Sequence, residues 1–367
     1  MSSAIRIPVA GLTSPTLQKV RIVIPTYNAA PFWAELSRSI SLQNIPSHQV
    51  LVVDSSSTDG TRSLAKASGY RVMCIPKEEF GHGTTRQLAC EYLPEAELLV
   101  FMTQDAVLES ANALMLLCQA LNDPAVGAAY GRQAPRLGAS PIERHARLFN
   151  YPKGNSVKTF ECRHTLGIKA AFCSNSFAVY RRSALQAVGG FPKDVILAED
   201  SVVAARMLMA GWRVAYCADA VAIHSHPLSM RQEFSRYFDT GVHHSREAWL
   251  QQVFGKAANE GKLFLRSELG YLGRRAPHLV PVAVLRTLNK FAGYHLGLLQ
   301  KSMPRWLLLK LSAHPGFWAG QAEPSPAKVT PEKVTPESAD AYAESYPRGS
   351  LALVERDVPF KQAARGN

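Results

Sequence analysis

Short apolar runs alternate with segments of helical spacing along the first third of the chain. The runs are rich in β-branched residues, end in small polar ones, and cover residues 20–25, 50–54, 71–75 and 98–102. Between them, apolar residues recur at helical intervals in 32–42, 60–68, 83–92 and 110–121. Strands that alternate with helices are typical of a parallel sheet whose two faces are covered. The pattern therefore predicts an α/β fold for this part of the chain.

The alternation becomes weaker after Pro124. Residues 132–170 are rich in Arg, His, Pro and Gly, which predicts a long connection that folds over a substrate. For the block that follows, the pattern predicts strands at 178–180, 212–216 and 220–223 and helices at 182–188 and 199–210. From Ser229 to about Trp318 the spacing is mainly helical, with breaks at prolines.

Shifts in composition divide the chain into four expected parts. They are an N-terminal extension at 1–19, an α/β domain at 20–228, a helical C-terminal extension at 229–320 and a tail at 321–367. Pro, Glu, Ala, Ser and Lys dominate the tail, which repeats the sequence Lys-Val-Thr-Pro-Glu. Such a segment cannot bury enough apolar surface to offset its loss of conformational entropy, so we expect it to be disordered.

The composition is that of an ordinary globular protein with a strong positive charge. Hydrophobic residues make up 47% of the 367 positions and charged residues 19%, which allows a sizeable core. The net charge of +12 favours anionic partners such as nucleotide phosphates, acidic glycans, anionic lipids or nucleic acid. Nucleic acid is disfavoured among these, because the basic residues are dispersed and form no recognised nucleic-acid motif.

Cysteine usage and the length of the apolar segments indicate the compartment. The six cysteines are scattered and form no Cys-x-x-Cys pair, which favours buried reduced thiols. Residues 1–19 lack the basic start and apolar core of a signal peptide. No stretch reaches the roughly 18 uninterrupted apolar residues that a membrane span requires. We therefore expect a cytoplasmic protein that contacts a membrane only peripherally.

Polar residues follow the first two predicted strands directly. Pro25-Thr26-Tyr27-Asn28 end the first strand, and Asp54-Ser55-Ser56 end the second. Parallel strands deliver such residues to one edge of a sheet, where nucleotides bind in α/β folds. The carboxylate of Asp54 can accept the imino proton of uracil or thymine and so select a pyrimidine. The alternative role of capping the next helix is better suited to the hydroxyl and acidic residues that come after it.

Two further segments carry groups suited to a diphosphate. Gly81-His82-Gly83-Thr84-Thr85-Arg86-Gln87 opens a helix with exposed amides and a guanidinium one turn later, which makes an anion site unless it is a simple glycine turn. The strand that ends in Phe101-Met102-Thr103-Gln104-Asp105 presents a single acid. One carboxylate is sufficient for Mg²⁺, which keeps several waters and binds substrate phosphates.

Acids and histidines occur together at two later positions. Glu199 and Asp200 begin a helix after a Gly-Gly-Phe-Pro break, where a carboxylate acts either as a general base or as a helix cap. His224 and His226 alternate at the end of a strand, so both imidazoles point to the same side. They lie within reach of one ion or phosphate, or have a structural role.

Taken in order, these segments resemble family 2 of the inverting glycosyltransferases over about residues 20–318. Phe80–Arg86, Thr103–Asp105 and His224–His226 are similar to the corresponding segments of its bacterial rhamnosyltransferase branch, with Gly81 in place of Asn and Thr84 in place of Gly. The resemblance implies a GT-A type fold, in which a nucleotide-sugar-binding sheet is flanked by helices. It assigns the nucleotide-binding half to 20–122 and the acceptor half to 123–228.

The resemblance also implies roles for single residues. Asp200 is the general base with Glu199 beside it, and Asn175 contacts the acceptor. A divalent cation, Mg²⁺ or Mn²⁺, is held by Asp105, His224 and His226. The residues that bind the donor are Pro25, Thr26, Tyr27, Asn28, Asp54, Ser56, His82, Gly83, Arg86, Gln104 and Arg132.

The implied activity is inverting transfer of L-rhamnose from dTDP-β-L-rhamnose to a glycan or lipid-linked glycan, during synthesis of O-antigen, lipopolysaccharide core or exopolysaccharide. The alternatives are another donor, a UDP- or GDP-sugar, and a nucleotide- or glycan-binding homologue without turnover. The basic and apolar helical region at 279–312 either lies on an anionic bilayer or packs as a cap on the main domain. The first of these would bring the protein to the inner face of the cytoplasmic membrane.

Overall fold

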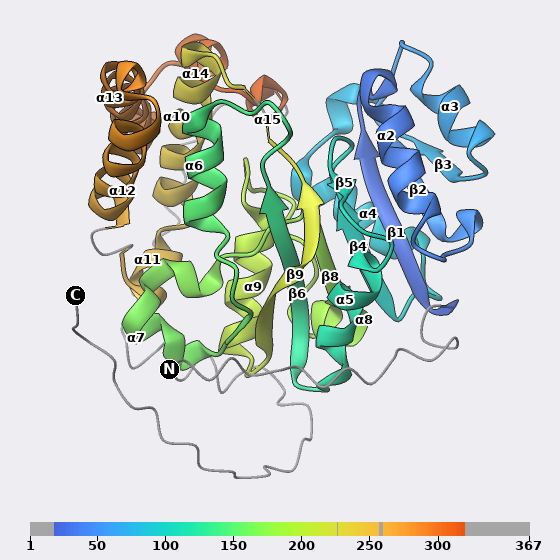
Figure 1. Cartoon of the computed structure of the whole chain (residues 1–367). Coiled ribbons are helices and arrows are strands. Elements are labelled where there is room, and N and C mark those ends of the chain that lie inside the picture. The colour runs from blue at the N-terminus through green and yellow to red at the C-terminus, as the bar shows by residue number, and fades with distance from the viewer. Residues whose placement is uncertain (1–17, 226, 257–259, 320–367) are drawn as a thin grey trace.

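One mixed sheet forms the centre of the structure, a computed structural model that describes residues 18–319 apart from 226 and 257–259 (Figure 1). Its strands are β1 (Val20–Thr26), β2 (Val50–Asp54), β3 (Arg71–Cys74), β4 (Leu98–Met102), β5 (Val107–Leu108), β6 (Val126–Ala134), β7 (Ser156–Lys158), β8 (Phe177–Arg181) and β9 (Arg213–Ile223). They lie in the order β3-β2-β1-β4-β8-β6-β9-β5, and β7 pairs with β9. The predicted tail at 321–367 and residues 1–17 of the predicted extension lie outside the described residues.

The pairing directions bring several chain ends to one edge of this sheet. β1 is parallel to β2 and β4, and β2 is parallel to β3. β8 is antiparallel to both β4 and β6, and β9 is parallel to β6. The C-terminal ends of β1, β2, β4, β6 and β9 therefore meet the N-terminal end of β8 at one edge, the upper one in Figure 1. We call it the carboxyl edge.

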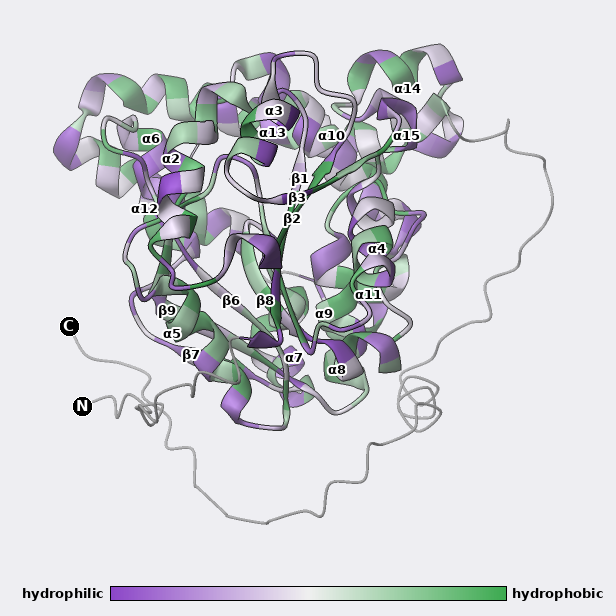
Figure 2. Ribbon diagram, turned by 90° about the vertical axis from the view of Figure 1, so that its right-hand side faces the viewer, coloured by the Kyte–Doolittle hydropathy of each residue, from purple (hydrophilic) through white to green (hydrophobic). Residues whose placement is uncertain are grey.

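Helices cover both faces of the sheet. Those of the α/β part are α2 (Ala30–Ser41), α3 (Thr61–Ala67), α4 (His82–Tyr92), α5 (Ala113–Gln119), α6 (Pro141–Asn150), α7 (Arg163–Leu166), α8 (Arg182–Ala187) and α9 (Glu199–Met209). One core lies between the sheet and α2, α3 and α5, and a second core lies on the other face with α4 and α9. The central strands are strongly hydrophobic, as expected for strands buried on both faces (Figure 2).

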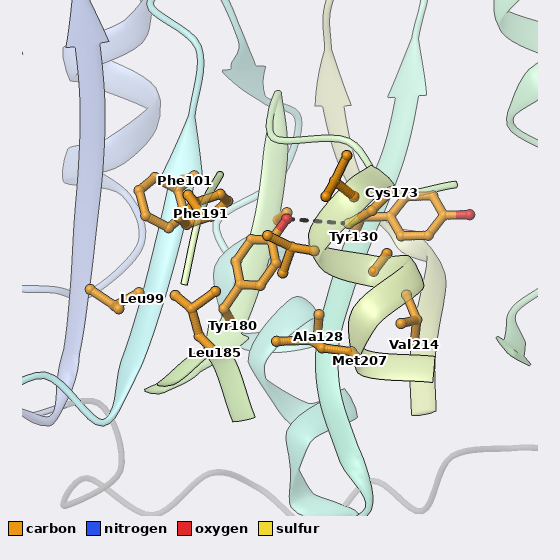
Figure 3. Packing of buried hydrophobic residues seen from close by; sticks show 14 of the residues in the cluster. Leu99, Phe101, Ala128, Tyr130, Cys173, Tyr180, Leu185, Phe191, Met207 and Val214 are labelled. Atoms are coloured by element: carbon orange, nitrogen blue, oxygen red, sulfur yellow. Dashed lines mark hydrogen bonds between the residues drawn. The ribbon is translucent and has the colours of Figure 1, made fainter. Parts of the chain in front are cut away.

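Neighbouring residues of one strand belong to different cores. In β4, Val100 packs into the first core and Phe101 into the second. This alternation follows from the period of two in an extended strand. In the second core, Phe101 and Tyr180 pack edge-on around Phe191, with ring centroids 5.1 and 5.3 Å from that of Phe191 (Figure 3). Aromatic packing of this kind fixes β4 and β8 at their meeting point with the chain that leads into α9.

The predicted α/β fold with a helical C-terminal extension is confirmed, but the expectation of a long connection at 132–170 is wrong. That stretch contains the end of β6 and then α6, β7 and α7. α6 begins at a capping box in which Ser140 and Glu143 each accept a hydrogen bond from the other's backbone amide. A Ser-x-x-Glu start signal was therefore present in the sequence. The strands predicted at 212–216 and 220–223 are one strand, β9, whose register against β6 shifts between Cys217 and Val221.

The C-terminal extension is a group of helices packed against the domain near the carboxyl edge (Figure 1). They are α10 (Met230–Arg246), α11 (Ala248–Phe254), α12 (Glu260–Arg275), α13 (Val280–Leu298), α14 (Arg305–Leu311) and α15 (Pro315–Ala319). α10 and α13 approach closely because Gly297 has no side chain: a Cβ there would lie 2.0 Å from the carbonyl oxygen of Phe238. No helix in the described part of the chain is both long and apolar enough to cross a membrane.

Candidate functional site

A cleft of about 830 Å³ opens at the carboxyl edge of the sheet. This is the position at which open α/β sheets bind their ligands. One side is lined by the ends of β1, β2 and β4, and the other by the start of α4, the segment before α9 and the segment around the start of α15. The predicted site residues on its wall are Pro25, Thr26, Tyr27, His82, Arg86, Gln104 and Asp105.

The loops after β1 and β4 are joined at the wall of this cleft. The backbone amide of Tyr27 donates to Gln104 Oε1 at 2.7 Å, and Gln104 Nε2 donates to the carbonyl of Tyr27 at 3.1 Å. The ammonium of Lys77 lies 4.3 Å from the centroid of the Tyr27 ring and donates to its hydroxyl at 2.7 Å. An aromatic ring and a cation therefore lie together on the wall, which suits a nucleotide.

Asp54 ends β2 and is fully buried. Its Oδ1 accepts a hydrogen bond from the Thr26 hydroxyl at 3.2 Å, and its Oδ2 accepts one from the Ser57 amide at 2.9 Å. Arg62 Nε lies 3.8 Å from the same Oδ2. The carboxylate thus holds the loops after β1 and β2 together, directly behind the cleft wall.

Asn28 and Ser56 brace the same loops from left-handed backbone conformations, with φ angles of 49° and 59°. The side-chain oxygen of Asn28 accepts a hydrogen bond from the Thr58 amide at 3.0 Å, and the Ser56 hydroxyl donates to the carbonyl of Ile75 at 2.9 Å. Both side chains bind backbone rather than line the cleft. Non-glycine residues in this conformation are uncommon and often mark functional loops.

The glycine segment at the start of α4 packs against the start of α9. Gly83 makes this approach possible, because a Cβ there would lie 1.7 Å from the carbonyl oxygen of Pro192. Arg86 Nη1 lies 3.0 Å from Glu199 Oε1, and both residues are only 4% exposed. The same Nη1 donates to the carbonyl of His82 at 2.9 Å, while Nε is buried without a hydrogen-bond partner. Since Arg86 lines the cleft, this remaining donor suits an anionic ligand.

Asp105, just after β4, meets His224 at the end of β9. His224 Nε2 lies 3.1 Å from Asp105 Oδ2. On the other side of the ring, Nδ1 lies 3.0 Å from Gln133 Oε1, an oxygen that can only accept. Gln133 therefore fixes the orientation of the imidazole and directs Nε2 toward the carboxylate. The two residues meet because β4 and β9, although distant in sequence, end at the same edge of the sheet.

Asp105 and His224 fit a divalent cation such as Mg²⁺ or Mn²⁺. The carboxylate of Asp105, which lines the cleft, and the imidazole of His224 lie side by side, and both are accepted donors for such ions. No group of three or more His, Cys, Asp and Glu side chains suited to a metal occurs in the described residues. Substrate phosphates and water would have to complete the coordination. His226, the third predicted ligand, lies outside the described residues.

Glu199 and Asp200 begin α9 immediately after Ala198, whose φ is 60°. Asn175, which precedes β8, contacts both acids: its Nδ2 donates to Glu199 Oε1 at 2.8 Å and its backbone amide donates to Asp200 Oδ2 at 3.0 Å. The Ser201 amide donates to Asp200 Oδ1 at 2.8 Å. The half-buried Asp200 carboxylate is therefore held at both oxygens, behind the Arg86–Glu199 pair.

The second core fixes Asn175 in turn. The Tyr180 hydroxyl donates to Asn175 Oδ1 at 2.8 Å. Figure 3 shows the second contact of this hydroxyl, with the sulfur of Cys173 at 3.5 Å. With its side-chain oxygen and nitrogen both engaged, Asn175 has one fixed orientation. The predicted acceptor residue is thus directly linked to the predicted base.

The two neighbouring acids have opposite protonation preferences. Burial, and then the negative charge of Glu199, raise the pKa of Asp200 to about 7. Burial would also raise the pKa of Glu199, but the charges of Arg86 and His82 and the Asn175 hydrogen bond outweigh it and hold that pKa below its usual value. Glu199 is therefore a permanent anion, whereas Asp200 exchanges its proton near neutral pH, as a general base should.

Arg132, another predicted donor residue, also lies away from the cleft wall. Arg132 lies on β6, where its Nε donates to the carbonyl of Ala218 at 2.8 Å and supports the irregular part of β9.

Three parts of the cleft wall were not predicted. They are the segment Lys77-Glu78-Glu79, the segment Lys193-Asp194-Val195-Ile196, and the segment Ala313-His314-Pro315-Gly316-Phe317. The last comes from the C-terminal extension, and its His-Pro-Gly-Phe-Trp sequence after a short helix was the one visible signal. Lys77 precedes the glycine segment, and a lysine there has no distinguishing pattern.

Known proteins similar to this chain are glycosyltransferases. A family model described as glycosyl transferase family 2 matches residues 21–189, and one described as glycosyl transferase family 21 matches residues 154–239. The O-antigen chain rhamnosyltransferase WbaN of Salmonella anatum is 44% identical over 298 residues, which cover 81% of this chain and 95% of that protein. RfbN of Salmonella typhimurium, another O-antigen chain rhamnosyltransferase, is 42% identical over 301 residues, which cover 82% of this chain and 96% of RfbN.

Among solved structures, the mannosyltransferase PcManGT from Pyrobaculum calidifontis, in complex with GDP-Man and Mn²⁺, aligns with a TM-score of 0.49. Its sequence identity is 25%, and the alignment covers 82% of this chain and 86% of that one. TarS 1–349 of S. aureus in complex with UDP aligns with a TM-score of 0.44 and 17% identity, over 78% of this chain and 92% of that one.

Proposed function

Because this chain belongs to family 2 of the glycosyltransferases, we propose that it transfers L-rhamnose with inversion from dTDP-β-L-rhamnose to a glycan or lipid-linked glycan acceptor in O-antigen synthesis. The rhamnose and the O-antigen chain are taken from the names of its Salmonella relatives, which align over nearly their whole length. The observation that carries the proposal is the convergence of Asp105, Arg86 and Asp200 at one edge of the sheet.

In this reaction Asp200 takes the proton of the acceptor hydroxyl. The acceptor oxygen forms a bond to the anomeric carbon on one face while the bond from that carbon to the diphosphate oxygen breaks on the other, so configuration inverts in one displacement. Two backbone hydrogen bonds orient the Asp200 carboxylate, and its pKa near 7 keeps a large fraction ionised at neutral pH. Asn175 would contact the acceptor from the same place.

The leaving diphosphate carries the negative charge that develops. Arg86 is held at the cleft wall by Glu199 and retains one unpaired donor for it. A divalent cation bound to Asp105 and His224 would supply further positive charge beside the diphosphate. Mn²⁺ binding followed by electron paramagnetic resonance tests this site without an activity assay. Asp105→Asn should weaken binding, whereas replacement of Glu109, an exposed acid just after β5, by Gln should leave it unchanged.

For the nucleobase, Asp54 remains our proposed contact to the pyrimidine imino group. A carboxylate has about four acceptor positions, and Asp54 uses two of them for Thr26 and Ser57. Because Asp54 is fully buried, the contact requires the loop after β2 to move when the donor enters. Tyr27 and Lys77 offer a stacking surface and a cation on the same wall.

A thermal-shift series with dTDP, UDP and GDP, each with Mg²⁺, tests the donor. We expect dTDP to raise the melting temperature most. Stabilisation by UDP or GDP without stabilisation by dTDP would show that the rhamnose donor is wrong. The activity itself is tested by incubating the intact protein with dTDP-rhamnose, Mg²⁺ and a panel of truncated glycans from its host, and detecting rhamnosylated product by mass spectrometry.

We also propose peripheral contact with the anionic inner face of the cytoplasmic membrane, through the outer face of α13. Val284, Leu285, Leu288 and Phe291 form an apolar stripe along this face, with Leu288 60% and Phe291 63% exposed. The cations of α13, Arg286 and Lys290, point away from it, toward Glu233 of α10. This differs from the expectation that they are part of a basic membrane surface.

The cations that fit an anionic bilayer lie beyond the ends of α13 instead. Arg274 and Arg275 precede it, and Lys301 and Arg305 follow it, next to the exposed Trp306. An apolar helix face with cations and a tryptophan at its margins is typical of helices that lie at a membrane interface.

Vesicle sedimentation tests this contact. The intact protein should bind vesicles that contain phosphatidylglycerol more strongly than pure phosphatidylcholine vesicles. Replacing Leu288 and Phe291 by Ser should reduce binding at least about tenfold, since two large apolar groups no longer enter the interface. Replacement by Ser of Leu42, an exposed leucine at the end of α2 in the α/β domain, should have no effect. Equal binding by all variants, or none by the intact protein, would contradict the proposal.

A further inference from the structure

The segment 312–317, which connects α14 to α15, forms part of the cleft wall although it belongs to the C-terminal extension. Ala313, His314 and Phe317 line the cleft opposite the strand ends that carry Tyr27 and Gln104. In Figure 1, α14 and α15 lie at the carboxyl edge of the sheet. The C-terminal helices therefore complete the site that the sheet begins.

A buried carboxylate fixes this segment in place. Asp239 of α10 is fully buried, and its Oδ2 accepts a hydrogen bond from the Ala313 amide at 2.8 Å. The His314 amide donates in turn to the Ser312 hydroxyl at 2.9 Å. A hydrogen bond to a carboxylate is among the stronger ones in proteins, and with the bond between His314 and Ser312 it restricts the backbone of this segment. The backbone from which the His314 side chain projects is thereby held.

The His314 ring packs edge-on against His82 from the glycine segment of α4. The two ring centroids are 4.8 Å apart with an interplanar angle of 88°, and Phe80 also packs against His82, with centroids 5.3 Å apart. The charge of Glu199 acts on both imidazoles, so the pair lies near the acids rather than at the nucleobase end of the cleft. The group of the donor that must lie beside Asp200 is the transferred sugar.

Burial favours the neutral form of both imidazoles. Burial, followed by the repulsion that a protonated His82 and Arg236 would exert, lowers the pKa of His314 to about 3, against the opposing influence of Glu199. Burial also lowers the pKa of His82. A neutral imidazole has one donor and one acceptor, which is also what a sugar hydroxyl offers. Further positive charge would instead favour the diphosphate.

We propose that His314, held by Asp239 through segment 312–317, contacts the sugar of the nucleotide-sugar donor and fixes its orientation together with His82. This inference rests on the proposed function, since it assumes that the cleft binds a nucleotide-sugar. It gives the C-terminal extension a direct part in donor recognition, in addition to its packing on the domain.

The test compares the donor with its nucleotide part alone. Dissociation constants for dTDP-rhamnose and for dTDP are measured by calorimetry in the presence of Mg²⁺, on the full chain and on His314→Ala, His314→Gln and Asp239→Asn. His278→Ala is the matched control, because His278 is an exposed histidine of the same extension away from the cleft. His314→Gln keeps a donor and an acceptor at similar volume, so it remains informative if the alanine variant folds poorly.

We expect His314→Ala to weaken binding of dTDP-rhamnose about tenfold, the effect of one hydrogen bond, while binding of dTDP changes less than about twofold. Asp239→Asn should act in the same direction, His314→Gln should recover part of the loss, and His278→Ala should match the unmodified protein. Equal weakening toward both ligands, or no weakening toward dTDP-rhamnose, would overturn the inference. If the unmodified protein binds a UDP- or GDP-sugar instead, the donor assignment fails separately, and the same comparison is made with that nucleotide and its sugar.

Discussion

Replacement of Glu199 by Gln should shift the pH dependence of turnover toward lower pH. The pKa of Asp200 is raised from 3.8 to about 7, first by burial and second by the negative charge of Glu199. Glutamine keeps the shape of the side chain and can still accept the hydrogen bond from Asn175. It removes the negative charge, and it also frees the positive charge of Arg86 to act on Asp200. Both changes favour the ionised form of Asp200.

The magnitude follows from the size of such interactions. A charge within a few ångströms shifts a carboxyl pKa by about 1 to 3 units. Since burial is the larger cause and remains, we expect a shift of about 1 unit. The acid limb of the pH–rate profile, where kcat falls as Asp200 is protonated, should then lie near pH 6 instead of 7. At pH 5 a base with a pKa of 7 is about 1% ionised and one with a pKa of 6 about 10%. The ratio of variant to unmodified turnover should therefore increase about tenfold between pH 8 and pH 5.

The assay is kcat measured from pH 5 to 9 with saturating donor, acceptor and Mg²⁺, because kcat reports the ionisation of the substrate-bound enzyme. The position of the limb matters and the plateau does not, since loss of the Arg86 partner will lower the plateau. Glu109→Gln removes one exposed negative charge elsewhere and should leave the limb in place. A limb that stays near 7 in Glu199→Gln, or that moves upward, would refute the electrostatic coupling of the two acids.

Three further changes test the site and its support. Asp200→Asn should lower kcat at least about a hundredfold, and a variant that keeps turnover would exclude Asp200 as the base. Its melting temperature at pH 8 should be no lower than that of the unmodified protein, because an ionised carboxyl whose pKa is raised by folding costs stability. Gly83→Ala should lower the free energy of unfolding by about 1 to 3 kcal/mol in urea titrations, because its Cβ would overlap the Pro192 carbonyl; an unchanged value would mean that α4 shifts freely. Burial lowers the pKa of Lys158 to about 8, so the folded protein loses this proton at a lower pH than the unfolded chain does. The free energy of unfolding, measured relative to that of Lys158→Met, should therefore rise by about 2 kcal/mol from pH 7 to 10. A difference between the two proteins that does not change with pH would show that Lys158 titrates normally.

The first four strands and the helices between them could be predicted because their information is local. Each strand is a short apolar run and each helix has its own spacing, so no knowledge of distant residues was needed. The carboxyl edge also followed, since parallel strands with crossover helices all end on the same side. That is why Thr26, Gln104 and Asp105 were correctly expected to lie together.

The contacts of Asn175 with Glu199 and Asp200 depend on strand β8, whose place in the sheet no local sequence pattern reveals. β8 enters the sheet antiparallel between β4 and β6, and its first residue, Phe177, pairs with Met102 at the end of β4. Only this reversed direction places Asn175, which precedes the strand, at the edge where the other strands finish. A parallel β8 would have carried Asn175 to the opposite edge, where it could not hydrogen-bond to the acids of α9. The sequence could therefore suggest which residues act, but their contacts depend on a strand pairing between segments that lie far apart along the chain.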